Sequence, residues 1–178
     1  LTSAALRNPI TPDTVLRAAF ALALVGDAAG AEQRVSEYLR MDDVEAGSDP
    51  QYRAPTQALI EIERGRPDPA IELLASVKPY ELGLACVPTY VRGLAHMRAG
   101  RPRDAAAEFG TITAHRGSLA NALIYPLAWL QLARARAAAS DTTGARQACE
   151  RFLTLWKDAD PDVPVLLAAR AELAALGR

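Results

Sequence analysis

The sequence predicts an all-α fold, an array of about four helix pairs that ends in one further helix. Three observations predict it. Alanine and leucine, both strong helix formers, supply 37 and 23 of the 178 residues, whereas aromatic residues make up only 6%. Apolar residues at helical spacing are interrupted by turn residues at nearly regular intervals. Residues at matching distances from those turns are alike.

The four turn residues lie 39, 35 and 40 positions apart, and they are Gly26, Gly65, Gly100 and Ser140. These intervals indicate a period of about 34 residues with short insertions, which is typical of a two-helix repeat. We therefore expect a single domain over residues 1–178. Its repeats should span about 12–45, 50–83, 86–119 and 126–159.

Small residues form two columns when the repeats are aligned on their turns. Seven positions before the turn are Ala19, Ala58, Gly93 and Ala133, and five positions after it are Ala31, Ala70, Ala105 and Ala145. Larger residues, nearly all apolar, lie nine and twelve positions after the turn: Val35, Leu74, Phe109 and Cys149, then Tyr38, Val77, Ile112 and Phe152. Small residues let two helix axes approach, and larger ones fill the neighbouring groove, so the columns predict repeated helix packing.

The turn chemistry predicts where each second helix begins. Glycine ends a helix in a left-handed conformation, and the residues that follow it are Asp27, Arg66-Pro67, Arg101-Pro102 and, after Ser140, Asp141. Because Ser140 replaces glycine, its turn should be strained or differently shaped.

The remaining segments complete the expected order of elements. An apolar stripe after the fourth repeat predicts a capping helix at about 162–177, with Arg170 and Glu172 on its outward face. Residues 41–50 and 115–125 have the composition of loops, and residues 2–6 look like the remnant of a preceding helix.

Charge and composition exclude several classes of function. The net charge is −1, so no basic face for nucleic acid is expected. The longest apolar stretch, residues 18–25, is too short to span a membrane, and we expect no membrane contact from this region. Leu1 follows no methionine or signal pattern, so the chain looks like a fragment of a longer protein. Cys86 and Cys149 lack metal-ligand spacing and are expected to be buried thiols in a reduced, cytoplasmic setting.

No residue constellation predicts catalysis, a metal site or a cofactor. Asp158, Asp160 and Asp162 alternate as in a calcium loop, but the glycine and the closing glutamate are missing, so helix capping is the simpler interpretation. His96 is expected to pack partly buried in a first helix, and His115 to end a helix. The sequence contains neither a serine-nucleophile motif nor a glycine-rich phosphate loop, so we expect a protein without enzymatic activity.

The chain resembles the tetratricopeptide repeat family, best through residues 90–109 and through Trp129 to Ala145. The resemblance implies a right-handed superhelical array, or solenoid, that binds proteins. More narrowly, residues 152–164, 115–117 and 78–83 resemble the C-terminal repeat region of large bacterial serine/threonine protein kinases, and similar regions follow winged-helix regulators. This implies a signalling role without kinase activity of its own, since the fragment contains no kinase motif.

Such an array would bind a protein or peptide in the concave groove formed by its first helices. By spacing from the turns, the inward stripe comprises Arg17, Phe20, Tyr52, Thr56, Leu59, Tyr90, Leu94, Met97, Gln131 and Arg134. Several of these side chains could instead pack against the neighbouring repeat. Two other functions also remain open: a self-associating spacer that forms homo-oligomers, and the sensor region of a winged-helix regulator.

Overall fold

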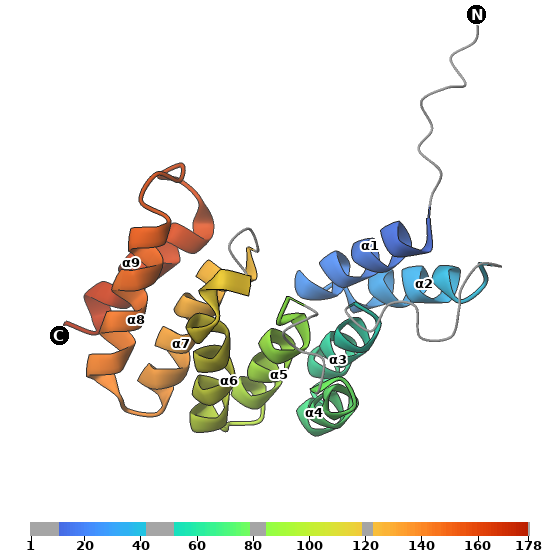
Figure 1. Cartoon of the computed structure of the whole chain (residues 1–178), viewed down its shortest axis with the longest axis horizontal. Coiled ribbons are helices and arrows are strands. Elements are labelled where there is room, and N and C mark those ends of the chain that lie inside the picture. The colour runs from blue at the N-terminus through green and yellow to red at the C-terminus, as the bar shows by residue number, and fades with distance from the viewer. Residues whose placement is uncertain (1–10, 42–51, 79–84, 119–122, 178) are drawn as a thin grey trace, which may run out of the picture.

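The computed structural model describes residues 11–41, 52–78, 85–118 and 123–177. These ranges contain nine α-helices, a short 3-10 turn at Arg116–Ser118 and no β-strand, which confirms the all-α fold. Helix pairs lie side by side from α1/α2 to α7/α8, and α9 is the last element (Figure 1). The helices are α1 Pro12–Leu24, α2 Ala28–Tyr38, α3 Arg53–Glu63, α4 Pro67–Ala75, α5 Val87–Arg98, α6 Pro102–Ala114, α7 Ile124–Ala138, α8 Thr142–Leu155 and α9 Pro164–Ala175.

The four turns within the helix pairs share one backbone geometry. Gly26, Gly65 and Gly100 have φ angles of 86°, 73° and 69°, and Ser140 has a φ of 66°. In each turn, this residue and the next donate backbone hydrogen bonds to carbonyls three and five positions back, at 2.8–3.2 Å, as in a Schellman motif. The turn at Ser140 therefore has the shape of the others, and the strain falls on a residue that carries a Cβ.

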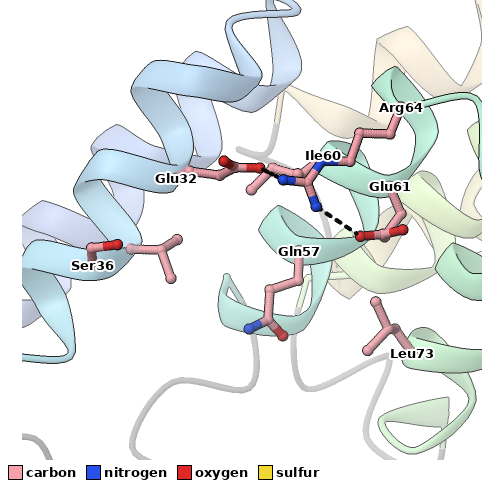
Figure 2. Close-up of a pocket in the computed structure, with 8 residues that line it drawn as sticks. Glu32, Ser36, Gln57, Ile60, Glu61, Arg64 and Leu73 are labelled. Atoms are coloured by element: carbon pink, nitrogen blue, oxygen red, sulfur yellow. Dashed lines mark hydrogen bonds and ion pairs between the residues drawn. The ribbon is translucent and has the colours of Figure 1, made fainter.

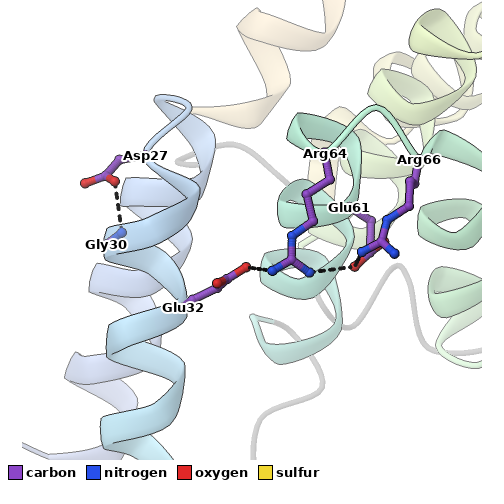
Figure 3. Close-up of polar contacts among 6 residues, drawn as sticks. All are labelled: Asp27, Gly30, Glu32, Glu61, Arg64 and Arg66. Atoms are coloured by element: carbon purple, nitrogen blue, oxygen red, sulfur yellow. Dashed lines mark hydrogen bonds and ion pairs between the residues drawn. The ribbon is translucent and has the colours of Figure 1, made fainter.

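The second helices begin in two different ways, with an aspartate cap or with a proline. The carboxylate of Asp27 accepts a hydrogen bond of 2.9 Å from the backbone N–H of Gly30 (Figure 3). The carboxylate of Asp141 accepts one of the same length from the backbone N–H of Gly144. Gly30 and Gly144 leave room for these carboxylates, because a Cβ at either position would collide with the carboxylate that caps the helix. The other two helices begin with proline, in α4 and α6, as the sequence predicts.

Burial confirms the columns of small residues. The four alanines five positions after the turns are 0% exposed, and the column seven positions before them is also buried. Phe109, Phe152 and Tyr38 are the largest fully buried side chains, and each lies in a column of larger residues. Gly93 takes the place of alanine where Phe109, the largest of the four residues nine positions after a turn, packs on it. The spacing from each turn thus determines which residues form the core of each pair.

Helix α9 packs on α8 through the buried residues Leu166 and Ala169. Arg170 is exposed as expected, but the expectation for Glu172 is wrong, because its carboxylate pairs with Arg134 of α7. Leu167 on the outer side is 50% exposed. The end of the array is therefore partly apolar rather than uniformly polar.

The expected loops are described only in part. Residues 2–6, 42–50 and 119–122 lie outside the described residues. Within 115–125, the loop expectation is wrong for Ile124 and Tyr125, which begin α7, and Tyr125 is buried there. None of the helices in the described ranges has the length and apolar character needed to cross a bilayer.

Candidate partner-binding groove

The first helices α1, α3, α5 and α7 lie on one side of the array and enclose a cavity. Helix α3 packs against both α1 and α5, whereas α7 packs on α8 and α6 and makes little contact with α5. This spacing leaves a cavity of about 450 Å³. It is lined by Ala23, Leu24, Leu59, Ile62, Glu63, Tyr90, Leu94, Met97, Arg98, Leu127, Gln131 and Arg134.

Tyr90 of α5 lies in this cavity beside Gln131 and Arg134 of α7. Its ring meets that of Phe109 edge-on, with centroids 5.7 Å apart. Burial raises the pKa of the Tyr90 hydroxyl, while the Gln131 side chain and the Arg134 charge act in the opposite direction. The hydroxyl therefore stays neutral.

Two ion pairs lie at the edge of this cavity. The guanidinium of Arg98 lies 3.6 Å from a Glu63 oxygen. The Nε and Nη2 atoms of Arg134 donate to the Glu172 carboxylate at 2.7–3.1 Å, in a forked arrangement. The side chains of Arg134 and Glu172 are 34% and 38% exposed, so this pair is accessible from solvent.

A second, more apolar cavity of about 340 Å³ lies on the other side of Arg134, between α7, α8 and α9. It exists because the fourth repeat has Cys149 and Ala137 where the third repeat has Phe109 and Met97 at equivalent distances from the turn. Its lining is Ala133, Arg134, Ala137, Cys149, Glu172, Ala175 and Leu176.

Cys149 is fully buried at this cavity, and its Sγ atom donates to the Ala169 carbonyl at 3.3 Å. Burial raises the pKa of its thiol. Cys86 is fully buried as well, and neither cysteine forms a disulfide, which confirms the expectation of buried thiols.

The structure brings six of the ten predicted groove residues to the 450 Å³ cavity, and they are Leu59, Tyr90, Leu94, Met97, Gln131 and Arg134. Arg17, Phe20 and Tyr52 form a separate stacked group: the Phe20 and Tyr52 rings are 5.4 Å apart, and the Arg17 guanidinium lies 5.1 Å from the Tyr52 ring centroid. Thr56 is fully buried and donates its hydroxyl to the Tyr52 carbonyl at 2.6 Å, so it is not available to a partner.

Sequence reasoning missed three exposed cavity residues that share one position. Leu24, Glu63 and Arg98 each lie two residues before a turn. The inward stripe ends at Met97, although Arg98 lies four residues after Leu94 and therefore on the same side of α5. Extending the stripe to the last residue of each first helix would have found them.

A third cavity, of about 470 Å³, lies between α2, α3 and α4 (Figure 2). Gln57, Ile60 and Arg64 line it from the side of α3 opposite to Leu59 and Ile62. Arg64 pairs with Glu32 of α2 and, at 3.3 Å, with Glu61. Figure 3 shows this network continuing to Arg66, whose Nε lies 2.7 Å from Glu61. The charged groups at this cavity are thus paired with one another and stabilise the contact between the first two repeats.

The polar residues considered for chemistry do not converge. No three His, Cys, Asp or Glu side chains within the described ranges gather closely enough to hold a metal ion. His96 is half-buried, with its Nδ1 atom 4.0 Å from an Asp104 oxygen. His115 ends α6 as expected, and its Nδ1 lies 2.7 Å from the Thr111 carbonyl oxygen.

Comparison with known proteins connects this geometry to a repeat fold. No family model matches the chain, and no curated protein matches it. Two crystal structures of TPR-like repeats from a putative kinesin light chain of Podosopora anserina are similar. One has 15% identity and a TM-score of 0.66 over 93% of this chain and 86% of that one. The other, a variant of the same repeats, has 18% identity and a TM-score of 0.64 over 96% and 87%. The chain therefore has the TPR-like repeat fold.

Proposed function

We propose that this chain is a non-catalytic scaffold that binds a peptide segment of a protein partner on the side of its first helices. The observation that carries the proposal is the 450 Å³ cavity, which all four first helices line. Its lining combines leucines with a methionine, a glutamine and arginines, a mixture that favours protein contacts. The TPR-like fold supports the proposal, because stacked helix pairs commonly present such a surface.

The test is partner capture from the source cells, followed by binding measurements with the purified partner. Leu24 is 43% exposed, so Leu24→Glu places a charge in the cavity without disturbing the core. Met97→Glu introduces a charge from α5, where the Met97 side chain is half-buried and packs on the core, so the helicity and melting temperature of this variant are measured alongside. The matched control is Leu39→Glu, since Leu39 is 53% exposed and lines none of the described cavities. We expect both cavity variants to lose the partner while the control retains it. Equal binding by all variants would contradict the proposal.

The proposal includes a bacterial signalling protein, such as a serine/threonine kinase, as the parent chain. It is supported by the resemblance of residues 152–164 and 115–117 to the C-terminal repeat regions of such kinases. In this context the scaffold works in the cytoplasm and binds protein rather than nucleic acid. The upstream reading frame of the gene tests this: a His-Arg-Asp catalytic loop would support it, and a winged-helix domain would support a transcriptional regulator instead.

A self-associating spacer is the second candidate, and the outer side of α9 favours it. Leu167 is 50% exposed there, and Ala171 and Ala174 are exposed beside it. Sedimentation velocity over a range of protein concentrations separates the two functions. A spacer would increase in mass with concentration, and Leu167→Glu would abolish the increase. A constant mass would exclude self-association.

A further inference from the structure

Arg134 occupies a special place among the first helices, because it lines two cavities at once. The 450 Å³ cavity lies toward α5, and the 340 Å³ cavity lies toward α9. Both offer apolar walls, from leucines on one side and from Ala133, Ala137 and Leu176 on the other. Each cavity is large enough for a bulky apolar side chain, and a single cation lies between them.

The guanidinium of Arg134 retains hydrogen-bonding capacity. Its Nε and Nη2 atoms bind Glu172, whereas Nη1 has no hydrogen-bond or ion-pair partner among the described residues. Glu63, the acid that lines the 450 Å³ cavity, lies beside Arg98. Because a guanidinium is a rigid, permanently charged donor, the free end of Arg134 favours an anionic oxygen. A carboxylate from a partner can share Arg134 with Glu172 or replace it.

The spacing of the cavities limits the shape of such a partner. The two cavities lie on opposite sides of α7, and a helix with its side chains is about 10 Å across. An extended peptide rises about 3.3 Å per residue, so it covers this width in about three residues. Two apolar side chains separated by about three residues can therefore enter the two cavities, with the segment between them passing over Arg134.

From these observations we infer that the groove binds an acidic peptide, in which a carboxylate side chain lies between two bulky apolar side chains about three residues apart. This inference rests on the proposed function and states the chemistry of the partner. Glu172 is then an internal competitor for Arg134, so removing its charge should strengthen binding.

Peptide display tests the inference without knowledge of the natural partner. Random heptapeptides fused at the N-terminus of a phage coat protein, and so without a free C-terminus, are selected on the full chain and counter-selected on Met97→Glu. The enriched peptides are then synthesised with amidated ends, and their affinities are measured by fluorescence polarisation. We expect them to contain an acidic residue flanked by bulky apolar residues.

Four variants distinguish the contacts. Arg134→Gln should lower the affinity for these peptides by about tenfold or more, since a charge-assisted hydrogen bond is lost. Ala137→Met fills the smaller cavity with the residue that the third repeat has at that position. It should lower the affinity for the peptides by a similar factor. Glu172→Gln should tighten binding severalfold. Ala107→Met, an equal change at an exposed position of α6 outside the described cavities, should have no effect.

The outcomes separate this inference from the proposed function. Peptides that need Met97 but lack an acid, or that bind Arg134→Gln as well as the original chain, would overturn the inference and leave the proposed function standing. Failure to enrich any peptide that depends on Met97 would overturn both. Circular dichroism and thermal melting of each variant show whether lost binding reflects lost structure.

Discussion

The ring of Phe109 packs on Gly93 so closely that a Cβ at residue 93 would lie 2.6 Å from two ring carbons. Gly93 belongs to α5 and Phe109 to α6, so this contact sets how closely the third helix pair can approach. The equivalent pair in the second repeat is Ala58 with Leu74, both fully buried. The two columns are therefore complementary in volume, with the smallest residue opposite the largest.

Gly93→Ala should destabilise the fold by about 1–3 kcal/mol through overpacking against Phe109. Adding Phe109→Leu should restore part of this loss, because it recreates the pair found in the second repeat. Urea unfolding of both single variants and the double variant measures the coupling, which should be at least about 0.5 kcal/mol. Gly110→Ala is the control, since a Cβ there meets nothing within 4 Å and should stabilise α6 by about 0.5–1 kcal/mol. Additive effects would contradict the contact.

Ser140→Gly should stabilise the chain by about 0.5–1 kcal/mol, because Ser140 holds a left-handed φ of 66° that glycine adopts without steric cost. The reciprocal change, Gly100→Ser, should destabilise it by a similar amount. A Cβ at Gly100 would meet no atom within 4 Å, so its effect comes from the backbone alone. Thermal melting of the two variants checks the opposite signs, and shifts of the same sign would contradict the shared turn geometry.

Glu108→Ala should cost about 3 kcal/mol of stability, because it removes a carboxylate that accepts two hydrogen bonds from a buried guanidinium. The Arg92 side chain is 5% exposed, and its Nε and Nη2 atoms donate to Glu108 at 2.9 and 2.5 Å. Glu72→Ala is the control, since Glu72 is exposed on α4 and its loss should change stability by less than about 0.5 kcal/mol. Chemical denaturation compares the two, and equal effects would show that the buried pair is not important for stability.

His96 should make the fold less stable in mild acid. Burial lowers the pKa of His96 in the folded chain below its ordinary value of 6.5; Asp104 and Glu108 oppose this, while Arg101 and Arg92 add to it. Below about pH 6.5 the unfolded chain therefore binds more protons at this residue, and stability falls as the pH drops. Melting temperatures at about pH 7.5 and about pH 5.5 measure the change. His96→Gln should reduce the dependence, and an unchanged slope would assign it to other groups.

Much of each helix pair could be predicted from the sequence, because its contacts are local and keep a constant distance from the turn. The alanines five positions after each turn, the Asp27 and Asp141 caps and the proline starts of α4 and α6 all follow from spacing and backbone chemistry. The shape of the turn at Ser140 was predicted only in part. Its hydrogen bonds hold the left-handed conformation although the residue is not glycine.

The contacts between pairs depended on the tertiary structure. Thr56 and Gln131 both lie nine residues before a turn, yet Thr56 is buried while Gln131 lines a cavity together with Tyr90. The difference arises because α3 packs against both α1 and α5, whereas α7 packs on α8 and α6 and leaves space beside α5. Likewise, Glu172 forms its ion pair with Arg134 only because α9 stacks on the fourth repeat. By itself the sequence determined the helix pairs and their cores. How the pairs stack, and therefore where the cavities lie, depends on side-chain volumes from different repeats acting together, which spacing along one chain does not reveal.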